Sequence, residues 1–154
     1  MDLFTAMHVG GSGLAAQRVR LNLAAENLAN ANTTQTPEGG PYRAKRVVLH
    51  SEPGQQGPGD FESYLRAGGA QALGGQAQPE YVQVHNIVED QSDPREVYDP
   101  GHPDANEEGF VKMPNIDTTT QMVDLMEASR SYRANTMTVS AAREMAMHAL
   151  QIGK

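Results

Sequence analysis

Proline is confined to the middle of this chain, and its distribution sets the first limit on the fold. All nine prolines lie between Pro37 and Pro114, and none occurs in residues 1–36 or 115–154. A proline inside a helix costs about 3 kcal/mol, because it removes a backbone hydrogen bond and its ring clashes with the preceding turn. The two ends are therefore free to form long helices, whereas the middle favours strands, turns and loops.

Charge and apolar content follow the same division. Residues 1–50 carry a net charge of +2 and residues 111–154 carry +1, whereas residues 51–110 carry -10, which together give the overall charge of -7. Leu, Ile, Val and Phe make up 27 of the 154 residues. This is below the share of about 20% at which a self-contained core becomes hard to fill. We therefore expect much of the apolar surface to be buried against partner chains.

The N-terminal arm repeats an apolar residue every seven positions, at Met7, Leu14, Leu21 and Leu28. Such a repeat is typical of the seam of a coiled coil, because it keeps one side of a helix turned toward a partner. The glycines within residues 10–13 weaken a helix, so we expect either a hinge or a close packing contact there. Asn27 and Asn30 are expected to satisfy backbone groups where this helix ends.

The C-terminal arm begins after Pro114 with residues that favour a helix start, Asp117 among them. Small and apolar residues then recur at spacings of three and four, and small residues permit helices to approach closely. Five of the eight methionines lie between Met122 and Met147, which suits a surface that adapts to non-identical neighbours. We expect the two arms to pair as a coiled-coil-like helical hairpin and to share one assembly interface, formed by Met7, Leu14, Leu21, Asn27, Leu28, Asn30, Met122, Leu125, Tyr132, Val139, Ala146 and Leu150.

The middle of the chain contains two stretches with the alternation or β-branched content of strands, residues 42–50 and 81–89. Between them, seven glycines fall within residues 54–75, which predicts a flexible loop over about 51–79. The sequence therefore predicts an α+β fold in three parts: an N-terminal helical arm over residues 1–34, a β-rich domain over 35–114 that includes this loop, and a C-terminal helical arm over 115–154.

Several classes of protein are not expected from this composition. The chain has no cysteine, so it offers no disulfide, no Cys-ligated zinc and no thiol nucleophile. No apolar run approaches the ~18 residues of a membrane span, and the first residues lack the basic and apolar regions of a cleavable signal peptide. The densest basic run, residues 43–46, is short and precedes an acidic middle that repels phosphate. We expect no membrane span and no nucleic acid.

Residues 104–109 match the opening of a calcium-binding loop, with oxygen ligands at its first, third and fifth positions and glycine at the sixth. The twelfth position is Asn115 rather than a bidentate glutamate, and nearby prolines prevent the flanking helices, so an ordered polar turn is preferred. Residues 11–16 imitate a dinucleotide-binding motif, but no strand precedes them. We expect no catalytic residue, no metal, no cofactor and no enzyme activity, while a calcium-binding or hydrolytic module remains an alternative.

Motifs in both arms and in the middle resemble those of bacterial flagellar rod and hook proteins. The N-terminal signature of that family is matched by Asn22 and by residues 12–18 and 25–33. Motifs similar to those of its proximal-rod members occur at residues 39–43, 98–106, 109–111, 114–117, 122–125 and 128–135. The resemblance reaches both ends of the chain and leaves mainly residues 51–79 unmatched.

This resemblance implies a structural subunit of the proximal rod of the flagellar basal body, in the periplasm and cell envelope, which transmits torque. Its terminal helices would form the inner wall of a helical tube, with the β-rich domain outside. Its partners would be its own copies, other rod subunits (FlgB, FlgF, FlgG and FliE) and the flagellar type III export apparatus, which exports such subunits without a cleaved signal peptide. The alternatives are another axial subunit, FlgB- or FlgF-like, and a soluble coiled-coil adaptor.

Overall fold

A computed structural model describes residues 3–53 and 80–152. Two helices, α1 (Leu3–Ala29) and α3 (Thr118–Ile152), enclose four strands in the sequence: β1 (Lys45–Pro53), β2 (Glu80–Glu89), β3 (Arg95–Tyr98) and β4 (Phe110–Met113). The predicted α+β class is confirmed. Nearly all of the predicted glycine-rich loop, residues 54–79, lies outside the described residues.

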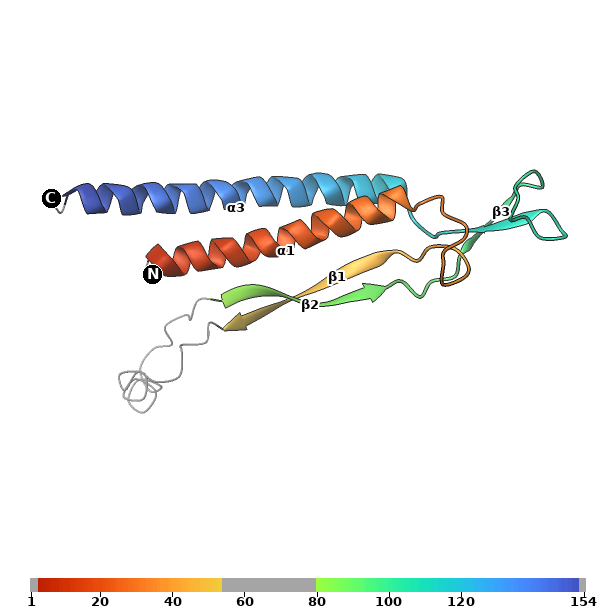
Figure 1. Ribbon diagram of the computed structural model, residues 1–154, viewed down its shortest axis with the longest axis horizontal. Helices are drawn as coiled ribbons and strands as arrows, with labels where there is room; N and C mark the ends of the chain where they lie inside the picture. Colours follow the sequence, from red (N-terminus) through yellow and green to blue (C-terminus); the bar gives the residue numbers. More distant parts are fainter. Residues whose placement is uncertain (1–2, 54–79, 153–154) are drawn as a thin grey trace, which may run out of the picture.

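The molecule is long and narrow (Figure 1). The helices α1 and α3 run antiparallel beside each other, and the sheet formed by β1 and β2 lies along α1 on the side away from α3. The short pair formed by β3 and β4 projects beyond the end of the helix pair. The two helices therefore share a long contact, while the strands leave much of their surface open.

The helix α1 is continuous through the glycines of residues 10–13, so a hinge at this point is the wrong expectation. The start of α3 matches the prediction, because the carboxylate of Asp117 accepts hydrogen bonds from the Thr119 amide at 3.1 Å and from the Thr120 hydroxyl at 2.6 Å. These bonds, led by the one from Thr120, lower the pKa of Asp117, since they stabilise its charged form. Asp117 is thus the capping residue of α3.

The larger sheet is an antiparallel pair in which Lys45 lies opposite Glu89 and Pro53 lies opposite Glu80. Its register shifts between Val48 and Leu49, where β2 contains one extra residue, His85. The second predicted strand, residues 81–89, agrees with β2 within one residue. The first begins three residues later than predicted, because the Tyr42 amide donates to the carbonyl of Thr33 and so belongs to the loop between α1 and β1. The four-residue strands β3 and β4 were not expected from the sequence.

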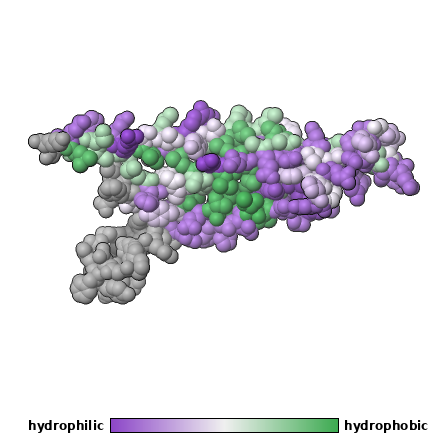
Figure 2. All heavy atoms as spheres, in the orientation of Figure 1, coloured by the Kyte–Doolittle hydropathy of each residue, from purple (hydrophilic) through white to green (hydrophobic). Residues whose placement is uncertain are grey.

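The core of the monomer is small, as the low apolar content predicts. Its buried apolar side chains are mostly small: Ala16, Leu23, Ala24, Ala31, Tyr42, Val111, Ala128 and Ala142. Apolar residues gather over the middle of the face seen in Figure 2, whereas the end that carries β3 and β4 is mainly hydrophilic. No helix within residues 3–53 and 80–152 is both long and apolar enough to cross a membrane.

Candidate assembly surfaces

Two glycines of α1 bring its backbone close to α3. A Cβ atom added to Gly10 would lie 2.7 Å from Cγ2 of Val139, and one added to Gly13 would lie 2.8 Å from Nδ2 of Asn135. By contrast, a Cβ atom at Gly11 would meet nothing within 4 Å. The glycine cluster therefore permits close packing of the two helices, which is the second of the two interpretations drawn from the sequence.

On α3, the side facing α1 is lined by residues spaced seven apart. Ala128 and Ala142 are buried, and Asn135 lies between them against Gly13. Three residues predicted for the interface, Leu125, Val139 and Ala146, are half-buried on this side. The small residues explain why the contact is close, because short side chains let two helix axes approach.

The four apolar residues predicted on α1 are only partly covered in the monomer. Met7, Leu14, Leu21 and Leu28 are all half-buried, whereas the buried residues of the helix are Gly10, Ala16, Leu23, Ala24 and Asn27. The sequence could have indicated part of this buried set, since Gly10 and Ala24 are small residues two heptads apart. The larger leucines dominate the periodic pattern in the sequence, although they leave part of their apolar surface open in the monomer.

Three further predicted interface residues on α3 are exposed: Met122, Tyr132 and Leu150. They belong to a larger set of exposed apolar side chains on this helix, which also includes Val123, Met126, Met137, Met145 and Met147. Leu150 is 73% exposed, and its part of α3 extends past the start of α1 (Figure 1). Apolar residues exposed along a whole helix mark a surface that binds another protein.

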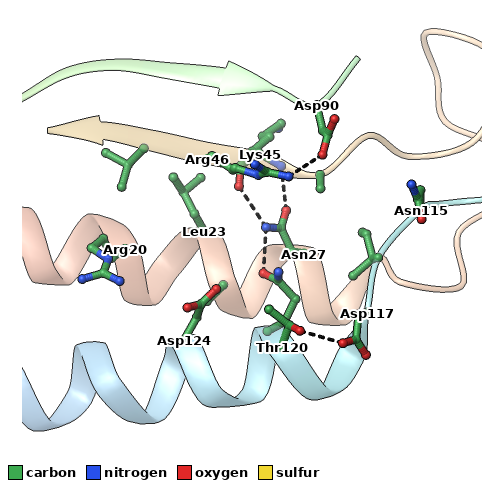
Figure 3. Close-up of a pocket in the computed structure, with 15 residues that line it drawn as sticks. Arg20, Leu23, Asn27, Lys45, Arg46, Asp90, Asn115, Asp117, Thr120 and Asp124 are labelled. Atoms are coloured by element: carbon green, nitrogen blue, oxygen red, sulfur yellow. Dashed lines mark hydrogen bonds and ion pairs between the residues drawn. The ribbon is translucent and has the colours of Figure 1, made fainter. Parts of the chain in front are cut away.

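Asn27 joins three segments of the chain at the end of the helix pair (Figure 3). Its Oδ1 atom accepts hydrogen bonds from the Lys45 amide at 2.9 Å and from the Tyr42 hydroxyl at 3.1 Å. Its Nδ2 atom donates to the Lys45 carbonyl at 2.9 Å and to Oε1 of Gln121 at 3.0 Å. Asn27 is only 3% exposed. It therefore holds β1 and α3 to α1, rather than satisfying the end of its own helix as the sequence suggested.

Asn30 has the role expected from the sequence. Its Nδ2 atom donates to the carbonyl of Glu26 at 3.0 Å, and its Oδ1 atom accepts from the Thr33 hydroxyl at 3.1 Å. These bonds satisfy a carbonyl in the last turn of α1 and fix the turn that follows. Asn30, which is half-buried, thus stabilises the end of α1 within the monomer.

Charges next to Asn27 stabilise the same junction. Nζ of Lys45 lies 2.8 Å from Oε1 of Glu26 and 5.7 Å from the centre of the Tyr42 ring. Burial, together with the negative charge of Glu26, raises the pKa of Tyr42 to about 12. The hydrogen bond to Glu26 raises the pKa of Lys45 above its ordinary value. The phenol is therefore held in its neutral form, in which it donates to Asn27.

An open cleft of about 560 Å³ lies where α1, β1 and the start of α3 meet (Figure 3). Side chains of both signs line it, among them Arg20 from α1, Arg46 from β1 and Asp124 from α3. Arg46 is already paired with Asp90 at 2.6 Å. Within the described residues, no group of three or more His, Asp or Glu side chains is arranged to hold a metal ion.

Residues 104–109, which match the opening of a calcium loop, form part of the connection between β3 and β4. The Oδ1 atom of Asn106 accepts hydrogen bonds from the amides of Glu108 at 3.1 Å and Phe110 at 2.8 Å. The Oδ2 atom of Asp104 accepts from the Thr34 hydroxyl at 2.7 Å. Asn106 thus holds the turn internally, and Asp104 joins it to the segment that follows α1, as in the ordered polar turn preferred from the sequence.

Comparison with known proteins shows the class of protein to which the chain belongs. Residues 7–35 match the family model described as flagella basal body rod protein, and residues 107–152 match the one described as flagellar basal body rod FlgEFG protein C-terminal. The two matches cover most of α1 and all of α3. They define a flagellar basal-body rod protein, built around its two terminal helices.

Relatives identify the branch of that class. The flagellar basal-body rod protein FlgC of Salmonella typhimurium is 40% identical over 154 residues, and that of Bacillus subtilis is 42% identical over 158 residues, with both chains fully covered in each case. The FlgC protein of Borreliella burgdorferi is 36% identical over 99% of this chain and 98% of its own. The chain belongs to the FlgC family. It is a structural subunit of the flagellar basal-body rod, where it assembles with other rod components.

Proposed function

We propose that this subunit belongs to the proximal part of the rod, within the periplasm and cell envelope, and transmits torque there as part of a helical drive shaft. The observation that carries the proposal is the row of exposed apolar side chains along α3. In the monomer, these methionines and Leu150 are exposed to water and contribute nothing to its small core. Burial against neighbouring subunits recovers that free energy, at roughly 25 cal/mol for each Å² of apolar surface.

The partners we propose are further copies of this chain, the rod subunits FlgB, FlgF, FlgG and FliE, and the flagellar type III export apparatus. Export through that apparatus requires an unfolded chain and uses no cleaved signal peptide. A small core supports this proposal, because a protein with few buried apolar residues costs less to unfold. The role is structural and involves no catalysis.

Within the subunit, we assign the inner wall of the rod to residues 1–34 and 115–154, and the outer domain to residues 35–114. The two arms pair as a coiled-coil-like hairpin, supported by the seven-residue spacing of Ala128, Asn135 and Ala142 opposite the glycines of α1. Met7, Leu14, Leu21 and Leu28 then lie at the edge of the pair, where a neighbouring subunit completes their burial.

The exposed residues of α3 supply the rest of the assembly interface. Met122, Tyr132 and Leu150 are proposed to contact neighbouring subunits directly, whereas Leu125, Val139 and Ala146 act mainly by holding α3 against α1. Methionine suits contacts with several different neighbours, because its flexible side chain adapts to irregular surfaces. This division separates residues that build the subunit from residues that join it to others.

The test is to supply this chain to its own host after deletion of the native gene, and to isolate basal bodies. We expect motility to return, and an antibody against the chain to label the proximal end of the rod. Label at a distal position would instead favour a FlgF-like place in the rod. A soluble, discrete oligomer that never enters basal bodies would contradict the proposal and favour an adaptor.

A further inference from the structure

The first of two surfaces with complementary chemistry lies at the end of the β3–β4 pair, in residues 98–110, here named the hairpin tip. Residues 99–108 contain four carboxylates and no lysine or arginine. Tyr98 is 66% exposed, and its ring packs edge-on against Phe110 with the ring centres 5.3 Å apart. The hairpin tip therefore combines an aromatic pair with four carboxylates in one short segment.

The second surface is the side of α3 that faces away from α1, here named the Arg–Met face and formed by Met126, Arg130, Arg133 and Met137. The spacing of four, three and four residues places these side chains on one side of the helix. All four are exposed, Met137 by 70%. In the part of the chain that the structure describes, neither arginine pairs with a carboxylate. The face therefore presents two cations between two apolar side chains.

The two surfaces cannot meet within one molecule. The hairpin tip projects beyond the end of the helix pair (Figure 1), whereas Arg130 lies 12 residues into α3 in the opposite direction. At 1.5 Å per residue, that distance along the helix is about 18 Å. A contact between them requires two molecules.

We propose that the hairpin tip of one copy binds the Arg–Met face of a second copy. The inference rests on the proposed function and deepens it, because it names which surfaces of two rod subunits meet. Carboxylates of the tip form charge-assisted hydrogen bonds with the two guanidinium groups. The Tyr98 ring lies against a guanidinium or a methionine, both of which pack well on aromatic rings.

The contact is head-to-tail, because it joins two different surfaces of identical chains. Each copy offers one hairpin tip and one Arg–Met face, so a bound pair still leaves one tip and one face free for further copies. Contacts of this type generate a ring or an open helical filament, and not a closed pair related by a two-fold axis. A helical rod requires the same property of its subunits.

The absence of cysteine from the sequence allows a direct test by disulfide cross-linking. A chain that carries both Glu107→Cys and Met137→Cys is expressed in place of the native protein, and assembled basal bodies are treated with a mild oxidant. We expect a ladder of linked dimers, trimers and larger products of this chain, which disappears on reduction. The matched control pairs Glu107→Cys with Thr138→Cys, whose side chain points to another side of the same helix, and it should give no ladder.

Charge reversal provides a second test that does not depend on disulfide geometry. Arg130→Glu combined with Arg133→Glu should abolish motility and incorporation into basal bodies, whereas adding Glu107→Arg and Glu108→Arg to the same chain should restore both. Arg143→Glu reverses a single charge further along α3, outside the Arg–Met face, and should have little effect. Failure of the compensating pair to restore motility, in a variant that is exported normally, would contradict the proposed contact.

The results also separate this inference from the proposed function. If the wild-type chain never enters basal bodies, the proposed function itself is wrong. If the chain enters basal bodies but Glu107→Cys with Met137→Cys gives no ladder, only the contact is wrong. If either cysteine instead forms cross-links to a different rod subunit, the proposal that the partner is a second copy of this chain is wrong.

Discussion

Cγ2 of Val139 occupies the space into which a side chain on Gly10 would have to extend, with only 2.7 Å to an added Cβ atom. This relationship fixes how near α1 and α3 can approach, and it identifies a residue whose value lies in having no side chain. The neighbouring Gly11 belongs to the same glycine cluster, but a Cβ atom added there would meet nothing within 4 Å. Substituting alanine at these two glycines should therefore change the stability of the subunit in opposite directions.

Gly10→Ala should destabilise the subunit, although alanine favours helices by up to ~1 kcal/mol over glycine. The added methyl group must displace Val139, and such overpacking costs about 1–3 kcal/mol. Gly11→Ala should raise stability instead, because nothing lies within 4 Å of its Cβ position. Thermal unfolding followed by circular dichroism would compare the two, and a higher Tm for Gly10→Ala would contradict the close contact.

Asn27→Asp should weaken the junction between α1, β1 and α3. A carboxylate can still accept hydrogen bonds from the amide of Lys45 and the hydroxyl of Tyr42, but it cannot donate to the Lys45 carbonyl or to Gln121. Buried polar groups left without a partner cost about 1–3 kcal/mol each. Asn22→Asp on the exposed side of α1 is the control, and urea unfolding should separate the variants. Equal midpoints would show that the Asn27 bonds contribute nothing net.

Alkaline pH should destabilise the subunit through Tyr42. Its pKa is about 12 in the folded chain and near 10 when unfolded, so the folded state holds the phenolic proton more tightly. The stability that this provides is complete below pH 10 and is lost as the pH rises from 10 to 12. Tyr42→Phe should flatten this part of the pH profile, whereas Tyr98→Phe, at an exposed ring, should leave it unchanged. Ultraviolet titration of the phenols gives the pKa directly.

Leu150→Asp should block rod assembly without unfolding the subunit. Leu150 is 73% exposed, so an aspartate there costs the monomer little, but it places an unpaired charge in the proposed interface. Val139→Asp and Leu21→Asp should block assembly too, and Val139→Asp should also destabilise the monomer because its side chain packs on Gly10. Burying an unpaired charge costs several kcal/mol. Motility and export into the medium are the measurements, and normal motility with Leu150→Asp would exclude this residue from the interface.

Much of the architecture could be read from the sequence, because proline and periodicity act locally. The absence of proline located α1 and α3, and the capping residue Asp117 located the start of α3. The strand β2 followed from its β-branched residues. The strands β3 and β4 have only four residues each, and their pairing depends on a glycine, Gly109, at a φ of 82°. Such short strands are defined by the turn between them more than by their own pattern.

The assembly surfaces were harder to predict, because burial depends on which neighbour a residue meets. The heptad of Met7, Leu14, Leu21 and Leu28 suggested a seam, but smaller residues fill the actual contact. Large side chains dominate a periodicity analysis, whereas close helix packing selects for glycine and alanine. The role of Asn27 could not be predicted from the sequence either, since its partners Lys45 and Gln121 are 18 and 94 residues away.

The steric fit between Val139 and Gly10 also governs how the two helices respond to mechanical load. Sliding α3 along α1 by four residues would move Val139 from Gly10 toward Ala6 or Leu14, which carry side chains where Gly10 has none. The same shift would move Asn135 away from Gly13, the second position where α1 has no side chain opposite α3. The helix pair therefore resists shear along its length by steric blocking of the two backbones, so a force applied to one helix passes to the other without slippage.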